Sequence, residues 1–286
     1  PQGYVRRESK QMTIDTAIHQ LTVADHFEKL LDAYPVLVTG KSQLALCQKW
    51  FANEAVLALD CEGKCLGRTG EISVIQLANA KGSCCVFDVL GSPDPDVVGF
   101  LKAILEDENI IKIIHDCRAD SDALYHHLGI RLAGVHDTQA WHCALQPQSF
   151  RLNLNNMLKN YNCATNNDRD TNVYKDDPAF WCKRPMSEAM VAWAAADVKV
   201  LHTLFEAQRS RTGKMQRNCK AACELYLREM RDAVIEDVAI EKSMLGKLIG
   251  KGGANIKRIS EETGAQLNVQ DDARVVIVGS DKKTVR

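Results

Sequence analysis

The sequence predicts a mixed α/β domain, with a sheet flanked by helices, followed by a smaller α+β domain. For the larger domain, the apolar run at residues 56–59 is typical of a strand buried on both faces, and three consecutive strand-like segments precede an alternation of helix and strand. For the smaller domain, a glycine-rich stretch at residues 250–253 separates two helical segments with strands on either side. At 286 residues and 45% hydrophobic content, the chain can bury one large and one small core.

The elements of the larger domain can be taken in order. We expect strands at residues 35–38, from 56 onward, and at 71–77, 84–89 and 110–114, with helices at 39–51, 95–106, 116–128 and 187–209. We expect residues 1–34 to form a separate helical extension, residues 35–209 the α/β domain, residues 210–235 a basic helical connector and residues 236–286 the small domain. Ser280 and Asp281 open a further helix that the chain ends too early to complete.

Two carboxylates, Asp60 and Glu62, follow the apolar run two positions apart. On a strand this spacing points both side chains to one side of the sheet. Hard oxygen ligands on a rigid strand suit Mg²⁺ or Mn²⁺. A strand that runs out into a polar loop is the better explanation for an isolated pair, so a metal site requires further carboxylates from elsewhere in the chain.

Two later segments offer such carboxylates. Asp116, Asp120 and Asp122 lie where a buried strand meets a helix, and the spacing predicts that Asp116 and Asp120 share a helical face while Asp122 turns away. Helix capping is the alternative explanation for an aspartate in a first turn. Asp197 lies among alanines in the middle of the last predicted helix, where small neighbours leave room for approach.

Three acidic motifs therefore stand in order along the chain: Leu59-Asp60-Cys61-Glu62, Asp116-x3-Asp120-x3-Leu124 and Ala194-Ala195-Ala196-Asp197. In this order they resemble the three exonuclease motifs of the DEDD superfamily. The stretch Trp181-Cys182-Lys183-Arg184-Pro185-Met186 is similar to the Trp-x-x-Arg-Pro-Leu stretch of the RNase D branch. The run that begins His115-Asp116-Cys117-Arg118 resembles the subgroup of Egalitarian and the exonuclease-domain proteins linked to piRNA.

This resemblance implies a ribonuclease H-like fold and hydrolysis of single strands from the 3′ end. It also implies two Mg²⁺ or Mn²⁺ ions about 4 Å apart, which only several anions can hold. By the same resemblance Asp60 would bridge both ions, Glu62 and Asp197 would help to hold the ion that activates water, and Asp120 would support the other. Asp116 would lie behind these ligands.

One position departs from the family pattern. Relatives carry a Tyr four residues before the last Asp, or a His five before it, and here these positions are Trp193 and Ala192. An indole offers one N–H donor and no acceptor, so Trp193 cannot take a proton from water. His115 and Tyr174 are the residues that would have to take over this role, supporting the site from behind the metal ligands.

The small domain resembles a type I KH domain through its Ile-Gly-x-x-Gly-x-x-Ile core. The glycines Gly250, Gly252 and Gly253 would let the loop backbone approach phosphates, and Lys251 would supply charge. Ile249 and Ile256 would form the floor of an apolar groove for about four unstacked bases.

Charge and cysteine content indicate the kind of partner and the cellular compartment. Residues 209–286 carry 16 Lys and Arg against 11 Asp and Glu, whereas residues 1–208 have a net charge of −6, so the basic end is expected to contact nucleic acid. An apolar run long enough to span a bilayer is lacking, which predicts no membrane partner. Eleven cysteines, an odd number in scattered contexts, favour reduced thiols in an intracellular compartment, with cytoplasm, nucleus and organelles not distinguished.

Three functions remain open from the sequence, of which the weakest is a protein-interaction scaffold in which neither site binds RNA. One is a 3′–5′ exoribonuclease whose KH module captures single-stranded RNA, although KH domains also accept single-stranded DNA. The second is an RNA-binding adaptor that keeps the nuclease fold without its activity. Retention of four carboxylates favours the first, and Trp193 favours the second. The sequence identifies no protein partner.

Overall fold

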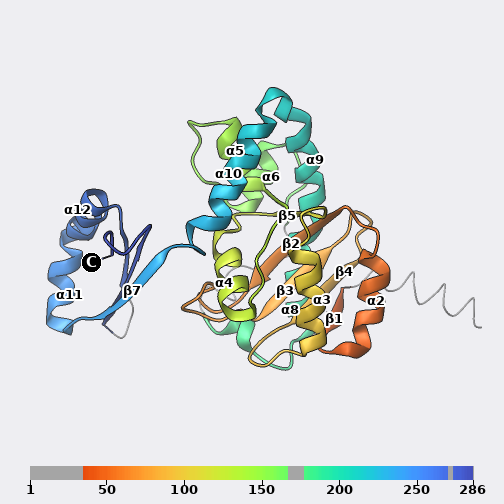
Figure 1. Cartoon of the computed structure of the whole chain (residues 1–286), viewed down its shortest axis with the longest axis horizontal. Helices are drawn as coiled ribbons and strands as arrows, with labels where there is room; N and C mark the ends of the chain where they lie inside the picture. The colour runs from red at the N-terminus through yellow and green to blue at the C-terminus, as the bar shows by residue number, and fades with distance from the viewer. Residues whose placement is uncertain (1–34, 167–176, 270–272, 286) are drawn as a thin grey trace, which may run out of the picture.

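The computed structural model describes residues 35–166, 177–269 and 273–285. The predicted N-terminal extension, residues 1–34, and Tyr174 lie outside these ranges. Within them, the predicted combination of a larger α/β domain and a smaller α+β domain is confirmed (Figure 1).

The larger domain is built on a six-stranded mixed sheet within the described residues. Its strands are β1 (Val36–Val38), β2 (Val56–Glu62), β3 (Val74–Ala78), β4 (Cys84–Asp88), β5 (Ile111–Ile114) and β6 (Val135–Asp137), in the spatial order β1-β4-β3-β2-β5-β6. β3 runs antiparallel to β2 and β4, and the other neighbours are parallel. β2, which carries Asp60 and Glu62, therefore lies inside the sheet with a strand on each side.

Helices cover both faces of this sheet. One face packs against α2 (Lys41–Phe51), α3 (Pro95–Leu105) and α4 (Arg118–Leu128). The other packs against the short helix η1 (Phe180–Cys182), α8 (Glu188–Lys199) and α9 (Leu201–Thr212). Because side chains alternate along β2, Leu57 and Leu59 enter the first core and Ala58 the second. Asp60 and Glu62 have the parity of Ala58 and so lie on the α8 face.

The predicted helix at residues 187–209 is interrupted at Val200, so the prediction of one continuous helix was wrong. Val200 ends α8 with φ −85° and ψ −14°, and α9 starts at the next residue. Val200 packs against a different hydrophobic cluster from Leu201. α8 packs against β2, β3 and β4, whereas α9 packs against α5 (Thr138–Leu145), β5 and β2.

The basic segment at 210–235 is mostly a docked helix. α10 (Gln216–Glu229) follows the short helix η2 (Gly213–Met215) and packs against α5, α4 and β6. Cys219 and Cys223 of α10 are buried against Ala140 and Trp141 of α5. With α6 (Leu154–Asn160) and α9, these helices gather at one end of the sheet (Figure 1).

The smaller domain follows directly. It comprises β7 (Val234–Ala239), α11 (Lys242–Ile249), the short helix η3 (Lys251–Gly253), α12 (Ala254–Thr263), β8 (Gln266–Val269) and β9 (Arg274–Gly279). The strands form an antiparallel sheet in the order β7-β9-β8. Figure 1 shows this domain as a separate lobe joined to the larger domain through β7. Across the described residues, no helix combines the length and apolar character that crossing a bilayer requires.

Candidate metal centre and nucleic-acid interface

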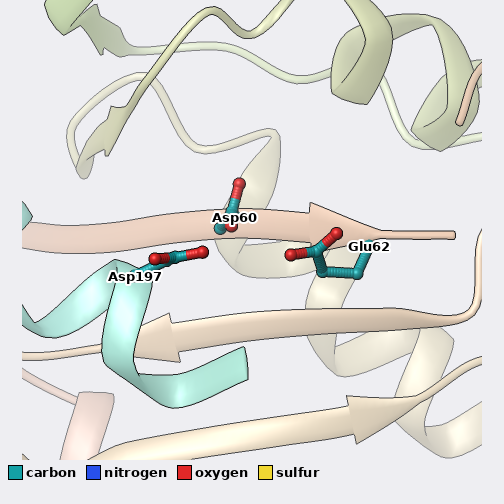
Figure 2. A group of neighbouring side chains, drawn as sticks. All are labelled: Asp60, Glu62 and Asp197. Carbon is teal, nitrogen blue, oxygen red and sulfur yellow. The ribbon is translucent and has the colours of Figure 1, made fainter. Parts of the chain in front are cut away.

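Three carboxylates from distant parts of the chain meet at the end of β2. Asp60 and Glu62 come from β2 and Asp197 from α8, and one oxygen of each lies within 4.8 Å of the others (Figure 2). Asp197 is only 9% exposed, whereas Asp60 and Glu62 are half-buried. The cluster is therefore open to solvent on the side of β2 and closed on the side of the helix.

Local sequence explains how α8 brings Asp197 so near the sheet. The helix begins at Ser187, whose hydroxyl accepts a hydrogen bond from the N–H of Met190 at 3.2 Å. Ala194 and Ala195, one turn before Asp197, are buried against the strands. Their small side chains allow the helix axis to approach β2 and β3 closely, which carries the carboxylate to the strand end.

Asp120 approaches from the opposite layer, on α4. It is 5% exposed, and its Oδ1 is buried without a hydrogen-bond partner among the described residues. Burial, and then the charge of Asp60, raise the pKa of Asp120 well above its usual range. The Cys61 thiol, hydrogen-bonded to Asp120, likewise has a pKa raised by burial first and by Asp120 second. Asp120 is thus beside Asp60, outside the 4.8 Å cluster but electrostatically coupled to it.

This arrangement fits a hard divalent cation. All donors are carboxylate oxygens, which suit Mg²⁺ and Mn²⁺. An orphaned buried oxygen such as Asp120 Oδ1 costs free energy unless a partner satisfies it. Concentrated negative charge in a partly buried site destabilises the metal-free protein, and a cation would relieve both penalties.

Sequence patterns did not identify Asn166, which contacts the cluster. Its side-chain Nδ2 donates to Asp197 Oδ1 at 2.6 Å, and the residue is 8% exposed. Asn166 lies in a segment without helical or strand periodicity, 31 residues from Asp197, so only the folded chain brings them together.

Gln76 is a second residue that the sequence did not single out. It pairs with Asp60 across β2 and β3, so the two side chains share the α8 face. Gln76 is fully buried, and both polar atoms of its side chain are without a hydrogen-bond partner among the described residues. A polar residue at the centre of an otherwise apolar strand was the available signal.

Arg184, from the stretch similar to Trp-x-x-Arg-Pro-Leu, binds groups within the larger domain. Its guanidinium makes a bidentate ion pair with Asp88, at 2.6 and 2.7 Å, and donates to the carbonyls of Ser73 and Trp181. These bonds fasten the segment before α8 to the ends of β3 and β4. Arg184 therefore supports the position of α8 and is not a free cation.

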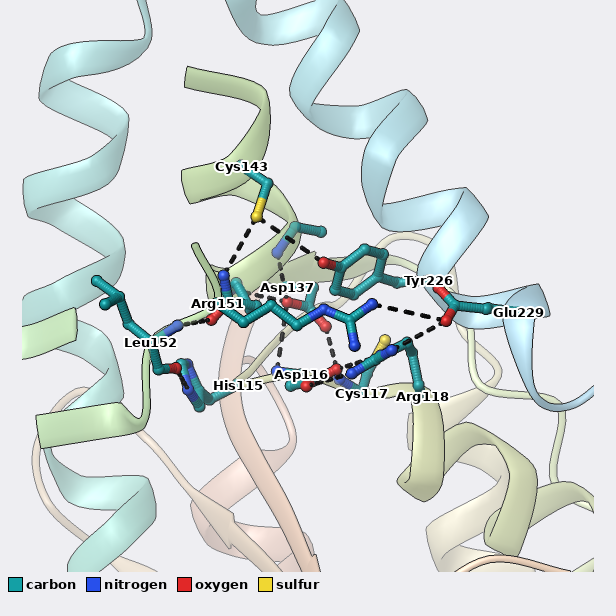
Figure 3. A network of polar contacts seen from close by, with 12 residues as sticks. His115, Asp116, Cys117, Arg118, Asp137, Cys143, Arg151, Leu152, Tyr226 and Glu229 are labelled. Carbon is teal, nitrogen blue, oxygen red and sulfur yellow. Dashed lines mark hydrogen bonds and ion pairs between the residues drawn. The ribbon is translucent and has the colours of Figure 1, made fainter. Parts of the chain in front are cut away.

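His115 belongs to a separate polar network (Figure 3). Its Nε2 lies 3.0 Å from the carbonyl oxygen of Leu152 and its Nδ1 lies 2.8 Å from the hydroxyl of Thr138. A carbonyl only accepts, so Nε2 carries the proton and Nδ1 accepts from Thr138. Burial lowers the pKa of His115. With both nitrogens occupied, His115 cannot take the place of the missing base, contrary to the sequence-based expectation.

Asp116 also differs from its predicted placement. It precedes α4, which begins at Arg118, and has φ 63°, so it does not share a helical face with Asp120. The backbone N–H groups of Asp116 and Cys117 both bind the buried carboxylate of Asp137, which fixes this turn. The Asp116 carboxylate pairs with Arg118 at 2.5 and 2.7 Å (Figure 3).

Trp193 lies on α8 one turn before Asp197. Its ring stacks on Phe180, with centroids 5.7 Å apart and planes 26° apart, and packs against the core beneath α8. The indole thus fills space that joins η1 to α8. Nothing in this position accepts a proton, as expected from its chemistry.

The smaller domain presents the glycine loop between α11 and α12. Gly250 has φ 72°, and a Cβ there would lie 2.9 Å from Asn255 Cγ, so the loop turns too tightly against α12 for any other residue. α12 begins at Gly253 without a side-chain cap. The positive end of this helix and the exposed Lys251 can attract anions, beside the half-buried Ile249 and Ile256.

Two family models match the chain. Residues 35–211 match the 3′–5′ exonuclease model, and residues 235–286 match the KH domain model. These two regions correspond to the larger and the smaller domain of the structure.

Individual relatives and solved structures are consistent with the two family models. The piRNA biogenesis protein EXD1 of Xenopus laevis is 38% identical over 87 residues, which is 30% of this chain and 19% of that protein. The Egalitarian protein homolog of Caenorhabditis elegans is 34% identical over 109 residues, 37% of this chain and 18% of that protein. The matches thus span about a fifth of those relatives. The structure of Trypanosoma brucei RNase D in complex with RNA U12 superimposes with a TM-score of 0.60 and 26% identity, covering 71% of this chain and 72% of the other.

Proposed function

Because the chain belongs to the 3′–5′ exonuclease family and carries a KH domain, we propose that it is a 3′–5′ exoribonuclease that shortens single-stranded RNA held by its KH module. The observation that carries the proposal is the meeting of Asp60, Glu62 and Asp197 within 4.8 Å, with buried Asp120 beside them. A resemblance between sequences does not by itself require that these carboxylates lie together in the folded chain.

Asp60, Glu62, Asp197 and Asp120 would hold Mg²⁺ or Mn²⁺. When bound, such ions supply positive charge against the phosphate and lower the pKa of water. The chain's own residues orient the carboxylates: Arg184 anchors the segment before α8, and Asn166 donates to Asp197. Half-buried Asp60 and Glu62 leave the side of β2 accessible to a strand end.

The KH module would bind the RNA backbone. Lys251 and the N-terminus of α12 offer positive charge for phosphates, and Ile249 and Ile256 offer an apolar surface for bases. T. brucei RNase D, which shares the fold, has been solved with RNA, and this supports RNA as the substrate class.

Trp193 supports a second candidate, a nuclease-fold RNA-binding adaptor without activity. Its indole stacks on Phe180 and has no acceptor, so the position that carries Tyr in relatives lacks a group that can take a proton. His115 is engaged elsewhere, which removes the replacement that the described residues offered.

Cleavage of 5′-labelled single-stranded RNA in Mg²⁺ or Mn²⁺ distinguishes the two candidates. We expect products that shorten from the 3′ end with the wild type and none with Asp60→Ala. Asp96→Ala is the matched control, because Asp96 is an exposed carboxylate paired with Lys41 on the helical layer. RNA that stays intact in both metals would refute the exonuclease.

Gly252→Asp tests the KH contribution. The backbone at Gly252 has φ 60° and ψ 24°, which Asp tolerates better than most residues, and a Cβ there meets nothing within 4 Å. The variant should fold and place a negative charge in the loop. If RNA is bound but never cut, and Gly252→Asp releases it, the adaptor is the correct function. Single-stranded DNA in parallel tests the sugar preference.

A further inference from the structure

Asp197 receives a directed hydrogen bond from outside the acidic motifs. Asn166 Nδ2 lies 2.6 Å from Asp197 Oδ1, and both residues are at least nine-tenths buried. A carboxylate has two oxygens and about four lone-pair directions, so it can accept a hydrogen bond and also bind a cation. The bond does, however, restrict the rotation of the carboxylate about its last torsion.

Asn166 is itself held by a second asparagine. Asn155 of α6 accepts from the backbone N–H of Asn166 at 2.9 Å and donates to its carbonyl oxygen at 2.7 Å. Both polar atoms of the Asn155 side-chain amide thus form hydrogen bonds with the backbone of Asn166, as a neighbouring β-strand would.

Asn155 lies on α6, a helix that is capped and packed against the core. α6 is capped by Asn153, whose Oδ1 accepts from the N–H of Asn156 at 2.9 Å. Met157 and Leu158 of α6 are fully buried against Leu204 of α9. Since α9 follows α8 directly, the helix that holds Asn155 and the helix that carries Asp197 are fixed to each other through the same cluster.

We propose that Asn166, held by Asn155, is a positioning residue that orients Asp197 for a divalent cation. The inference rests on the proposed function, in which these carboxylates bind metal. A neutral amide suits the task because it fixes an anionic ligand without neutralising it, whereas a lysine or arginine would compete with the cation. Partners behind a metal ligand typically contribute 10-fold to 100-fold to metal affinity.

The test is Mn²⁺ binding by the full chain, measured by titration calorimetry and by electron paramagnetic resonance of free Mn²⁺. We expect Asn166→Ala to weaken binding by about 10-fold to 100-fold and Asn155→Ala to weaken it less, in the same direction. Asn156→Ala is the matched control, because Asn156 is the next residue of α6 and is exposed. It should bind Mn²⁺ like the wild type.

A second measurement separates positioning from stability. In the metal-free protein, Asn155→Ala should unfold at a lower temperature than Asn156→Ala, because two hydrogen bonds to the Asn166 backbone are lost. The rise in unfolding temperature on adding Mn²⁺, measured from each variant's own metal-free value, should shrink only in Asn155→Ala and Asn166→Ala. Wild-type Mn²⁺ affinity in both variants would overturn the inference and leave the proposed function intact. A wild type that binds no Mn²⁺ would overturn the proposed metal site, and this inference with it.

Discussion

Arg68 provides the most direct test of how the two domains are joined. It lies in the loop after β2, and its Nε donates to Asp122 Oδ1 at 2.7 Å, while its backbone N–H donates to Asp122 Oδ2 at 2.6 Å. Its remaining nitrogens donate to the carbonyls of Met230, Arg231 and Ala233, just before β7. One side chain therefore connects the metal-site loop, α4 and the start of the KH domain.

Arg68→Ala should be strongly destabilising. The Asp122 side chain is 2% exposed and that of Arg68 17%, so removing the arginine leaves a buried carboxylate without its main cation. Breaking a buried pair in this way costs about 3–5 kcal/mol in unfolding free energy. The exposed pair of Lys41 and Asp96 has a similar N···O distance of 2.9 Å, but Lys41→Ala should cost far less than Arg68→Ala because both of these side chains stay in water.

Urea unfolding of the single variants, of Asp122→Ala and of the Arg68→Ala/Asp122→Ala double variant measures the pair. The double variant should be more stable than the sum of the single changes predicts, because the uncompensated charge is gone. Limited proteolysis should also cut Arg68→Ala faster at residues 230–235 than wild type. A cost for Arg68→Ala no larger than that for Lys41→Ala would refute the argument from burial.

Three further predictions concern single side chains. Trp193→Tyr restores a proton acceptor one turn before Asp197, and we expect RNA cleavage to rise by about 100-fold; an unchanged rate would show that the base is not limiting. Gln76→Leu removes two buried polar atoms without partners among the described residues, and should raise the unfolding free energy of the metal-free protein by about 1–3 kcal/mol; no gain in urea unfolding would mean that water satisfies them. Burial lowers the pKa of Lys112 to about 8, so as the pH rises the folded state loses this proton before the unfolded state does. The unfolding free energy of the wild type relative to Lys112→Met should therefore rise by roughly 2–3 kcal/mol between pH 7 and pH 10. Parallel stability–pH profiles for the two proteins would contradict this prediction.

Local patterns predicted strand β2 and the glycine loop of the smaller domain, whereas β6, α5 and α6 were not predicted. Strand β2, with its two carboxylates on one face, follows from apolar residues and a period of two. The glycine loop of the KH domain follows from the backbone at position 250, where a positive φ and close contact with Asn255 admit only glycine. Both depend on residues close together in the chain, whose preferences the sequence displays directly.

Only the tertiary structure decided which distant groups meet. The sequence placed His115 beside the carboxylates, but its nitrogens bind Thr138 and Leu152 because α5 and the loop before α6 close over it. It gave no reason to pair Asn166 with Asp197, 31 residues away, since side-chain partners across a fold depend on packing that no periodicity encodes. The chain by itself determined four carboxylates in order along the sequence; the packing of α4 and α8 on opposite faces of β2 decided that three of them meet and that Asp120 reaches Asp60 from the other side.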